Sequence, residues 1–195
     1  MQPKEKYDMI AFTAPSGAGK TTIVKHLLNK YSDFLQFSIS ATTRDKRENE
    51  IDGKDYYFLS AEEFKANIVN NKFIEWEEVY SNQYYGTLFS EVDRIHATGK
   101  KVIFDIDVHG AENIKTRYKD RCLTVFVKPP SFVELVQRLT NRKTETEKSF
   151  RRRIIRIKKE LLFENSFDMV LLNDILEDTF QNAEQIVENK MIDSQ

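Results

Sequence analysis

Residues 12–22 read FTAPSGAGKTT, a stretch that falls one residue short of the phosphate-binding pattern G-x-x-x-x-G-K-[ST]. Gly19, Lys20 and Thr21 fill the last three positions, but Ala14 stands where the pattern begins with glycine. An apolar run precedes the stretch and a helical pattern follows it, which is the order of strand, loop and helix in which such loops bind phosphate. The stretch therefore predicts a nucleotide-binding α/β fold.

The chemistry of the loop suits a nucleoside polyphosphate such as ATP. Its backbone N–H groups can surround a polyphosphate at the N-terminus of the following helix. Lys20 adds a positive charge for the outer phosphates, and Thr21 adds a hydroxyl for Mg²⁺. A glycine-rich turn before a helix can also arise by chance, but the order of elements favours a binding site. We assign ATP binding to the whole loop, which consists of Ala14, Pro15, Ser16, Gly17, Ala18, Gly19, Lys20, Thr21 and Thr22.

Ala14 is compatible with this assignment if its backbone is extended. A positive φ at an alanine would cost about 1–2 kcal/mol. Pro15 follows directly, and a residue before proline is pushed towards extended conformations with negative φ. We therefore expect an extended Ala14 and a loop that binds phosphate normally.

Composition and charge indicate one compact domain and point to neither a nucleic-acid nor a membrane partner. The chain has 195 residues, of which 40% are hydrophobic and 31% are charged, and its net charge is −1. This balance gives no reason to expect binding to nucleic acid or to an anionic membrane. No apolar run is long enough to span a bilayer and no export signal is present, so we expect a cytoplasmic protein. The single cysteine, Cys122, precedes an apolar run and is predicted to be a buried thiol.

Apolar runs alternate with helical patterns along most of the chain, which is typical of a parallel sheet with helices on both faces. We expect one domain over 1–195, with a three-layer α/β core formed by residues 1–36 and 91–195. The expected strands are 9–13, 101–107, 123–127 and 169–172, and the expected helices lie near 21–30, 108–117, 131–141, 147–164 and 177–192.

Residues 37–90 interrupt this alternation and predict a lobe inserted at the edge of the core. Short aromatic strands are expected at 56–59 and 73–76, with a helix between them. Ser60 and Glu63 form the Ser-x-x-Glu pattern of a capping box, which predicts that this helix begins at Ser60. Because no flexible linker is present, we expect the lobe to move as a unit on short hinges.

The lobe carries residue types that suit a second, phosphorylated substrate. The run SISATTRDKR (38–47) places hydroxyls beside Arg44 and Arg47, whose guanidinium groups are spaced to bind one phosphate. A solvated surface is the alternative interpretation of this arginine pair. Glu75 is a carboxylate among apolar neighbours, where burial without a partner is costly. Such a carboxylate can accept from both N1–H and the 2-amino group of guanine, a pair of donors that adenine lacks.

At this point the sequence resembles the guanylate kinase family, and the resemblance extends from about Ile10 to Asn173. Seven stretches in the family's order carry it: PSGAGKT, SATTRDKR, DGKDYYF, FIEW, YYGT, FDIDVHG and RL…R-x-TETE. Ala14 is a departure from the phosphate-loop pattern. The resemblance implies a P-loop fold with a GMP-binding lobe and a mobile lid near 138–150. It also implies Mg²⁺-dependent phosphate transfer from ATP to GMP, without a covalent intermediate.

The resemblance also implies roles for individual residues on the acceptor side. The expected ligands of the GMP phosphate are Ser40, Arg44, Arg47, Tyr56 and Tyr85. Glu75 and Thr87 are expected to read the guanine base. Asp105 and Asp107, which follow a core strand, are expected near the GMP site, with Thr21 and Asp105 at the metal. Capping of the strand end, or a structural ion pair, is the alternative role for the two aspartates.

On the donor side, the resemblance implies that Arg138, Arg142 and Arg153 close over ATP. Lys20, Arg44, Arg142 and Arg153 are the expected catalytic residues, since they neutralise charge during transfer. The other basic residues of FRRRIIRIKK are interpreted as a solvated helix face. Asn173 is expected to contact adenine, with a turn or helix-capping role as the alternative.

Two other functions remain open from the sequence. A guanylate-kinase-like domain can act as a binding module without catalysis, although Lys20, Thr21 and Arg44 are all retained here. A related kinase can act on another small phosphate such as a ribose bisphosphate, although FIEW and YYGT favour a base in the acceptor site. The sequence leaves the oligomeric state undetermined.

Overall fold

A parallel sheet forms the centre of the molecule. The structure, a computed structural model, describes residues 7–140 and 147–192. Within them, the central sheet has the strand order β2-β7-β1-β8-β9, and every neighbouring pair is parallel. Its strands are β1 (Met9–Thr13), β2 (Leu35–Phe37), β7 (Lys101–Ile106), β8 (Cys122–Lys128) and β9 (Met169–Leu172).

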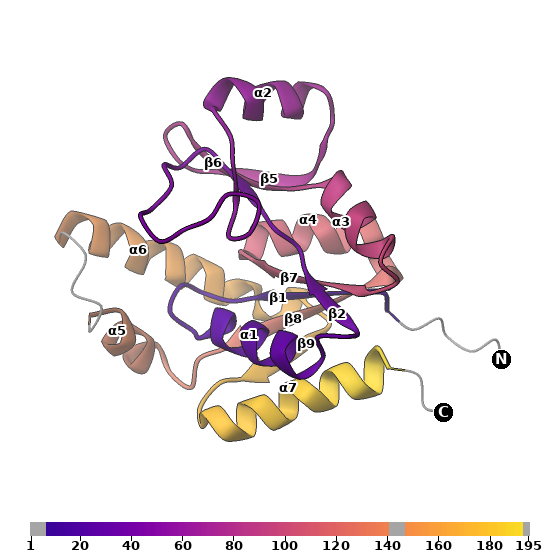
Figure 1. Ribbon diagram of the computed structural model, residues 1–195. Coiled ribbons are helices and arrows are strands. Elements are labelled where there is room, and N and C mark those ends of the chain that lie inside the picture. Colours follow the sequence, from indigo (N-terminus) through magenta and orange to yellow (C-terminus); the bar gives the residue numbers. More distant parts are fainter. Residues whose placement is uncertain (1–6, 141–146, 193–195) are drawn as a thin grey trace.

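Helices cover both faces of this sheet and complete a three-layer α/β core (Figure 1). The helices are α1 (Lys20–Lys30), α3 (Phe89–His96), α4 (Val108–Tyr118), α5 (Phe132–Thr140), α6 (Glu147–Glu160) and α7 (Leu176–Lys190), with short 3₁₀ turns η1 (Lys119–Arg121) and η2 (Leu161–Ser166). Helices α1, α5 and α7 contribute to one buried cluster, and α3 and α4 contribute to the other.

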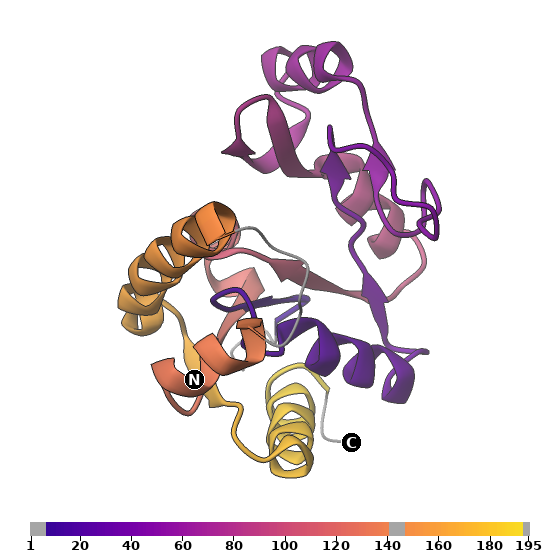
Figure 2. The same ribbon diagram turned by 90° about the vertical axis from the view of Figure 1, so that its left-hand side faces the viewer.

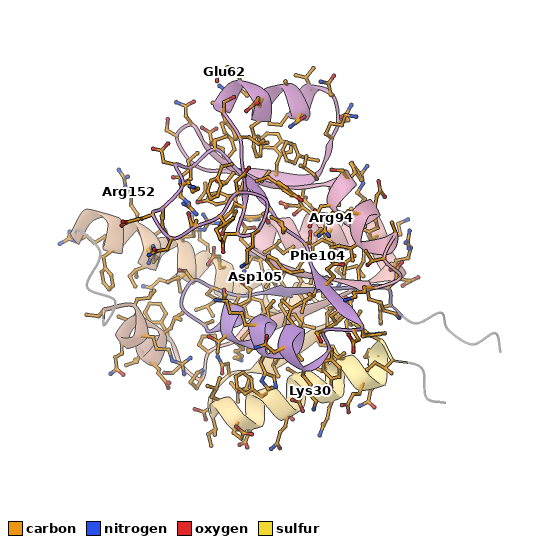
Figure 3. All side chains as sticks on the ribbon, viewed as in Figure 1. Lys30, Glu62, Arg94, Phe104, Asp105 and Arg152 are labelled. Atoms are coloured by element: carbon orange, nitrogen blue, oxygen red, sulfur yellow. The ribbon has the colours of Figure 1, made fainter. Side chains whose placement is uncertain are left out.

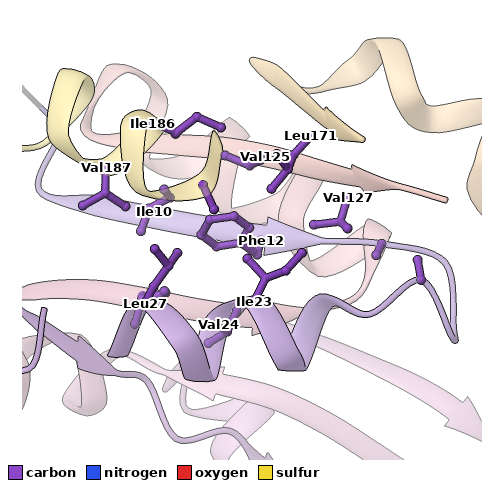
Figure 4. Packing of buried hydrophobic residues seen from close by; sticks show 14 of the residues in the cluster. Ile10, Phe12, Ile23, Val24, Leu27, Val125, Val127, Leu171, Ile186 and Val187 are labelled. Carbon is purple, nitrogen blue, oxygen red and sulfur yellow. The ribbon is translucent and has the colours of Figure 1, made fainter. Parts of the chain in front are cut away.

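Strand β1 is buried on both faces, as expected for the middle of a parallel sheet. Phe12 packs among residues of α1 and α7, including Leu27 and Val187 (Figure 4). The alternate residues Met9 and Ala11 belong to the cluster on the opposite face. The strand that leads into the phosphate loop is therefore fixed from both sides.

The inserted lobe has a sheet and a small core of its own. Its strands, in spatial order, are β4 (Tyr57–Phe58), β3 (Ala41–Thr42), β6 (Gln83–Leu88) and β5 (Phe73–Tyr80), beside helix α2 (Ala61–Val69). Phe64 of α2 is fully buried and stacks on the rings of Phe73 and Tyr84. Figure 2 shows the lobe to one side of the core; the chain enters the lobe after β2 and returns to the core from β6 into α3.

The predicted strands and helices of the core are present, with ends that differ by a few residues. The helix predicted at 147–164 ends as an α-helix at Glu160 and continues as the tighter η2. The capping box of Ser60 and Glu63 is confirmed at the start of α2. The thiol of Cys122 is buried, as predicted. The limits 37–90 for the lobe remain a prediction of domain organisation.

Strand β3, strand β6, helix α3 and the 3₁₀ turn η1 were not predicted. Strand β3 has two residues, too few to show a periodicity. Strand β6 contains glutamine and glycine and was interpreted only as a binding motif. Helix α3 follows it directly and buries Val92 and Ile95. Among the helices described, none combines the length and apolar character needed to cross a bilayer.

Candidate active site

The phosphate loop connects β1 to α1 and has the backbone conformation that its glycines permit. Gly17 and Gly19 have φ values of 92° and 91°, in the left-handed region that favours glycine. Among the described non-glycine residues, those with positive φ are Asn71, Asn82 and Lys119, so Ala14 does not have a positive φ. Alanine therefore fits the first position of the loop without strain, in agreement with the sequence analysis.

Side chains of the core pack against the phosphate loop and hold its backbone in place. Asn173 is buried, and its amide nitrogen donates to the carbonyl oxygen of Ala18 at 2.6 Å. A Cβ at Gly19 would collide with the same amide, and a Cβ at Gly17 would lie 2.9 Å from Leu139 of α5. The structure thus gives Asn173 a supporting contact with the loop, while its expected contact with adenine remains a prediction.

Asp105 links the loop to the neighbouring strand β7. Its Oδ1 lies 2.7 Å from Lys20 Nζ, and its Oδ2 accepts from Thr21 Oγ1 at 2.6 Å. Lys20 also donates to the carbonyl oxygen of Ile106. The hydroxyl of Thr21 and the carboxylate of Asp105 are oxygen donors of the kind that Mg²⁺ prefers. Together they suit an ion that is held mainly by phosphates and water.

Glu75 and Thr87 form a buried pair on adjacent strands of the lobe. The register of β5 and β6 places the two residues opposite each other, and Thr87 Oγ1 donates to Glu75 Oε1 at 2.6 Å. Burial raises the pKa of Glu75 to about 7, assisted by the charge of Asp107 and opposed by the hydrogen bond from Thr87. Gly110 leaves space for this carboxylate, because a Cβ there would lie 2.9 Å from Glu75 Oε2.

A charged cluster adjoins Glu75 and joins the predicted residue Asp107 to Glu77 and Arg156. The interpretation of the basic residues around Arg153 as a solvated helix face is therefore wrong for Arg156. Arg156 of α6 lies 3.2 Å from Glu77 and 3.4 Å from Asp107, and its Nε donates to Glu160 at 2.7 Å. Burial and the hydrogen bond with Asp107 raise the pKa of Glu77. The pKa of Asp107 is lowered despite burial, because it accepts hydrogen bonds from Glu77 and from the backbone N–H of Gly110.

Two signals could have identified this cluster from the sequence. Glu77 lies two residues after Glu75, on the same face of a strand. Arg156 lies three residues after Arg153, on the same face of a helix. Asp107 also caps the N-terminus of α4, and its pair with Arg156 is the structural ion pair considered as its alternative role.

The phosphate loop, the lobe and α6 face one cleft of about 690 Å³. Beyond Ala14–Thr22, the predicted site residues in its lining are Ser40, Tyr56, Glu75, Tyr85, Asp105, Asp107 and Arg153. Figure 3 labels Asp105, between core and lobe, and Arg152, on α6. The structure therefore brings most of the predicted donor and acceptor residues into one cavity.

The remaining predicted residues lie outside this lining. Thr87 is buried behind Glu75, and Asn173 is buried beneath the loop. Arg138 Nη2 donates to Glu134 at 2.5 Å and to the backbone oxygen of Asn173 at 3.4 Å. Arg44 is paired with Glu50, and Arg47 is exposed. Residues 141–146 of the predicted lid, which include Arg142, lie outside the described residues.

Comparison with known proteins agrees with this arrangement. The family model described as guanylate kinase matches residues 6–190. The chain belongs to the guanylate kinase family. Its relatives include a guanylate kinase of Porphyromonas gingivalis, 48% identical over 168 residues, which are 86% of this chain and 89% of the relative. A guanylate kinase of Bacteroides fragilis is 45% identical over 179 residues, 92% of this chain and 87% of the relative.

Solved structures support the same fold. The guanylate kinase of Anaplasma phagocytophilum has a TM-score of 0.72 at 24% identity, over 97% of this chain and 89% of that one. The SH3-kinase fragment of tight junction protein 3 has a TM-score of 0.52 at 11% identity, over 96% of this chain and 59% of that one. At these identities the likeness concerns the fold alone. The family membership predicted from the sequence is confirmed by the family model and the curated relatives.

The contact between Gly19 and Asn173 predicts different effects of alanine at two left-handed glycines. Gly99→Ala places a Cβ in open space at φ +75° and should cost about 1–2 kcal/mol of unfolding free energy. Gly19→Ala carries a similar backbone cost and also displaces the amide of Asn173, so ATP affinity should fall only in this variant. Urea unfolding and ATP titration of both variants measure the two effects. Equal ATP affinity in the two variants would contradict the supporting role of Asn173.

The raised pKa of Glu75 predicts a pH-dependent difference in stability between the protein and Glu75→Gln. Its pKa is 4.5 in the reference state and about 7 in the folded protein, so the folded state retains the proton more tightly. The stability that this proton contributes is present below about pH 4.5 and is lost as the pH rises to about 7. The variant should therefore gain up to about 3 kcal/mol relative to the wild type across this window. Urea midpoints at several pH values test this, and a constant difference would refute it.

Proposed function

We propose that the protein transfers the terminal phosphate of ATP to GMP, giving ADP and GDP. The observation that carries this proposal is the shared cleft, in which the phosphate loop and Glu75, held by Thr87 behind it, face the same space. A phosphate loop alone suits many activities, whereas a buried carboxylate beside it selects an acceptor with matching donors. The alternatives are a binding module without catalysis and a kinase for a small sugar phosphate.

Glu75 is the proposed reader of the guanine base. In its ionised form it can accept from N1–H and from the 2-amino group, while the hydroxyl of Thr87 holds it in place at 2.6 Å. A site built around such paired hydrogen bonds rejects bases that lack the donors, because its buried polar groups would be left without partners. The proposed ligands of the GMP phosphate are Ser40, Arg44, Arg47, Tyr56 and Tyr85.

Positively charged side chains around the loop would stabilise the phosphate group during its transfer. Lys20 is held by the carboxylate of Asp105 and the carbonyl oxygen of Ile106, both at the end of β7. From there its Nζ can stabilise negative charge on the phosphate group as it passes from ATP to the acceptor. Arg153 lines the same cleft and would approach the ATP phosphates from α6. Arg138 and Arg142 are proposed to join it, so that the reacting groups are aligned and water is excluded.

The residues Thr21 and Asp105 are proposed to hold Mg²⁺ together with ATP. When bound there, Mg²⁺ would neutralise charge on the phosphate oxygens. Asp107 is proposed to lie beside the acceptor, through its place in the cleft lining. A cytoplasmic location remains a prediction from the sequence.

A coupled assay for ADP release tests the proposal directly. With ATP and Mg²⁺, turnover is expected with GMP, and rates about 10⁴-fold lower are expected with AMP, CMP and UMP. GMP binding without turnover would favour the binding module. Faster turnover with ribose 1,5-bisphosphate than with GMP would favour the sugar-phosphate kinase.

A further inference from the structure

Glu50 binds the guanidinium group of Arg44 through both of its carboxylate oxygens. Arg44 Nη1 donates to Oε2 and Nη2 donates to Oε1, each at 2.7 Å. The backbone N–H of Arg47 also donates to Oε2, at 2.9 Å. These bonds lower the pKa of Glu50 to about 2, so its carboxylate stays ionised over the whole range in which enzymes are assayed. The arrangement fixes the segment that carries both arginines of the proposed phosphate site.

Three of the five N–H donors of the Arg44 guanidinium group have partners in the structure. A guanidinium group has five N–H donors, two on each Nη and one on Nε. On Nη1, one donor goes to Glu50 and the other goes to the backbone oxygen of Asp45 at 2.8 Å. On Nη2, one donor goes to Glu50. Within the described part of the chain, no hydrogen bond uses the second N–H of Nη2 or the N–H of Nε, and these two donors point outward from the same edge of the planar group.

A second arginine in the protein binds an oxyanion through the same edge, formed by Nε and Nη2. Arg94 uses its Nε and Nη2 to bind the carboxylate of Glu91, at 3.0 Å and 2.6 Å. A phosphate presents oxygens with comparable spacing and accepts the same paired bonds. In Arg44, Glu50 occupies the other edge of the group, so the edge that suits a phosphate is left available.

Aromatic contacts place Arg44 beside the cleft. Its guanidinium carbon lies 5.1 Å from the ring centre of Tyr56 and 5.6 Å from that of Phe58. The ring of Tyr56 meets that of Tyr85 edge to face at 6.0 Å, and both tyrosines line the cleft. The guanidinium group thus packs against a ring that forms part of the cleft wall.

We propose that Glu50 is a positioning residue for the acceptor phosphate, which holds Arg44 so that its Nε and Nη2 donors remain available to a phosphate monoester in the cleft. This inference rests on the proposed function, since it requires the acceptor phosphate to bind between Tyr56 and Tyr85. Glu50 acts through Arg44 and Arg47 and does not touch the substrate. Without this carboxylate, ordering of the arginine side chain would oppose binding.

The test compares Glu50→Gln with Glu63→Gln by calorimetry and steady-state kinetics. Glu63 is a matched control because its carboxylate also accepts a backbone N–H within the lobe, that of Ser60 at 2.8 Å, but it serves the cap of α2. Glutamine at position 50 can accept from one Nη, but its NH₂ group faces the other donor. GMP and guanosine are the probes, because they differ only in the phosphate.

In Glu50→Gln, the Kd and KM for GMP should rise on the order of tenfold, with kcat changed much less. Affinity for guanosine should stay unchanged in Glu50→Gln, since the base site is intact. Glu63→Gln should leave both ligands unaffected, and Glu50→Asp should recover part of the GMP affinity.

Three results would overturn the inference. GMP affinity equal to that of the wild type would show that Glu50 does not position Arg44. Tighter GMP binding would show that Glu50 competes with the phosphate for Arg44. Equal losses for GMP and guanosine would show a general structural role. A wild-type protein that binds no GMP would instead contradict the proposed function, so the two failures are distinguishable.

Discussion

The parallel pairing of β1 with β7 is the constraint on which the rest of the site depends. It places Phe12 beside Asp105 in the register, so the phosphate loop and the acidic end of β7 leave the sheet at the same edge. Lys20 and Thr21 can then both reach Asp105. Because β1 is buried on both faces, this edge is held by the packing of the core.

The concentration of carboxylates in the cleft follows from the same geometry and has an energetic consequence. Glu75, Glu77 and Asp107 come together where the lobe meets the core, and burial of several like charges is unfavourable unless cations or protons compensate them. Arg156 supplies a cation between Glu77 and Asp107. Burial raises the pKa of Glu75 and that of Glu77, so bound protons compensate the negative charge that Arg156 does not. A guanine base brings donors to this acidic region, and therefore complements it better than a base that brings acceptors.

Much of the fold and of the donor side could be predicted from the sequence, because the signals there are local. The glycines of the loop closely follow the apolar run of β1 in the sequence, and Pro15 restricts Ala14 to an extended conformation with negative φ. The partners of these residues could not be predicted in the same way. Asn173 supports Ala18 from a position 155 residues away in sequence, and Arg156 reaches Glu77 across 79 residues. Such contacts depend on the docking of α6 and the lobe, which no local pattern describes.

The measurement that tests the acceptor site most directly is the affinity for GMP and IMP, in the wild type and in Glu75→Gln. IMP retains N1–H but lacks the 2-amino group, so the wild type should prefer GMP by about tenfold or more, since a hydrogen bond to a charged group is lost. In Glu75→Gln this preference should largely disappear, because the carboxylate that accepts both donors is gone. A preference for GMP that persists unchanged in Glu75→Gln would contradict the assignment of Glu75 as the reader of the base.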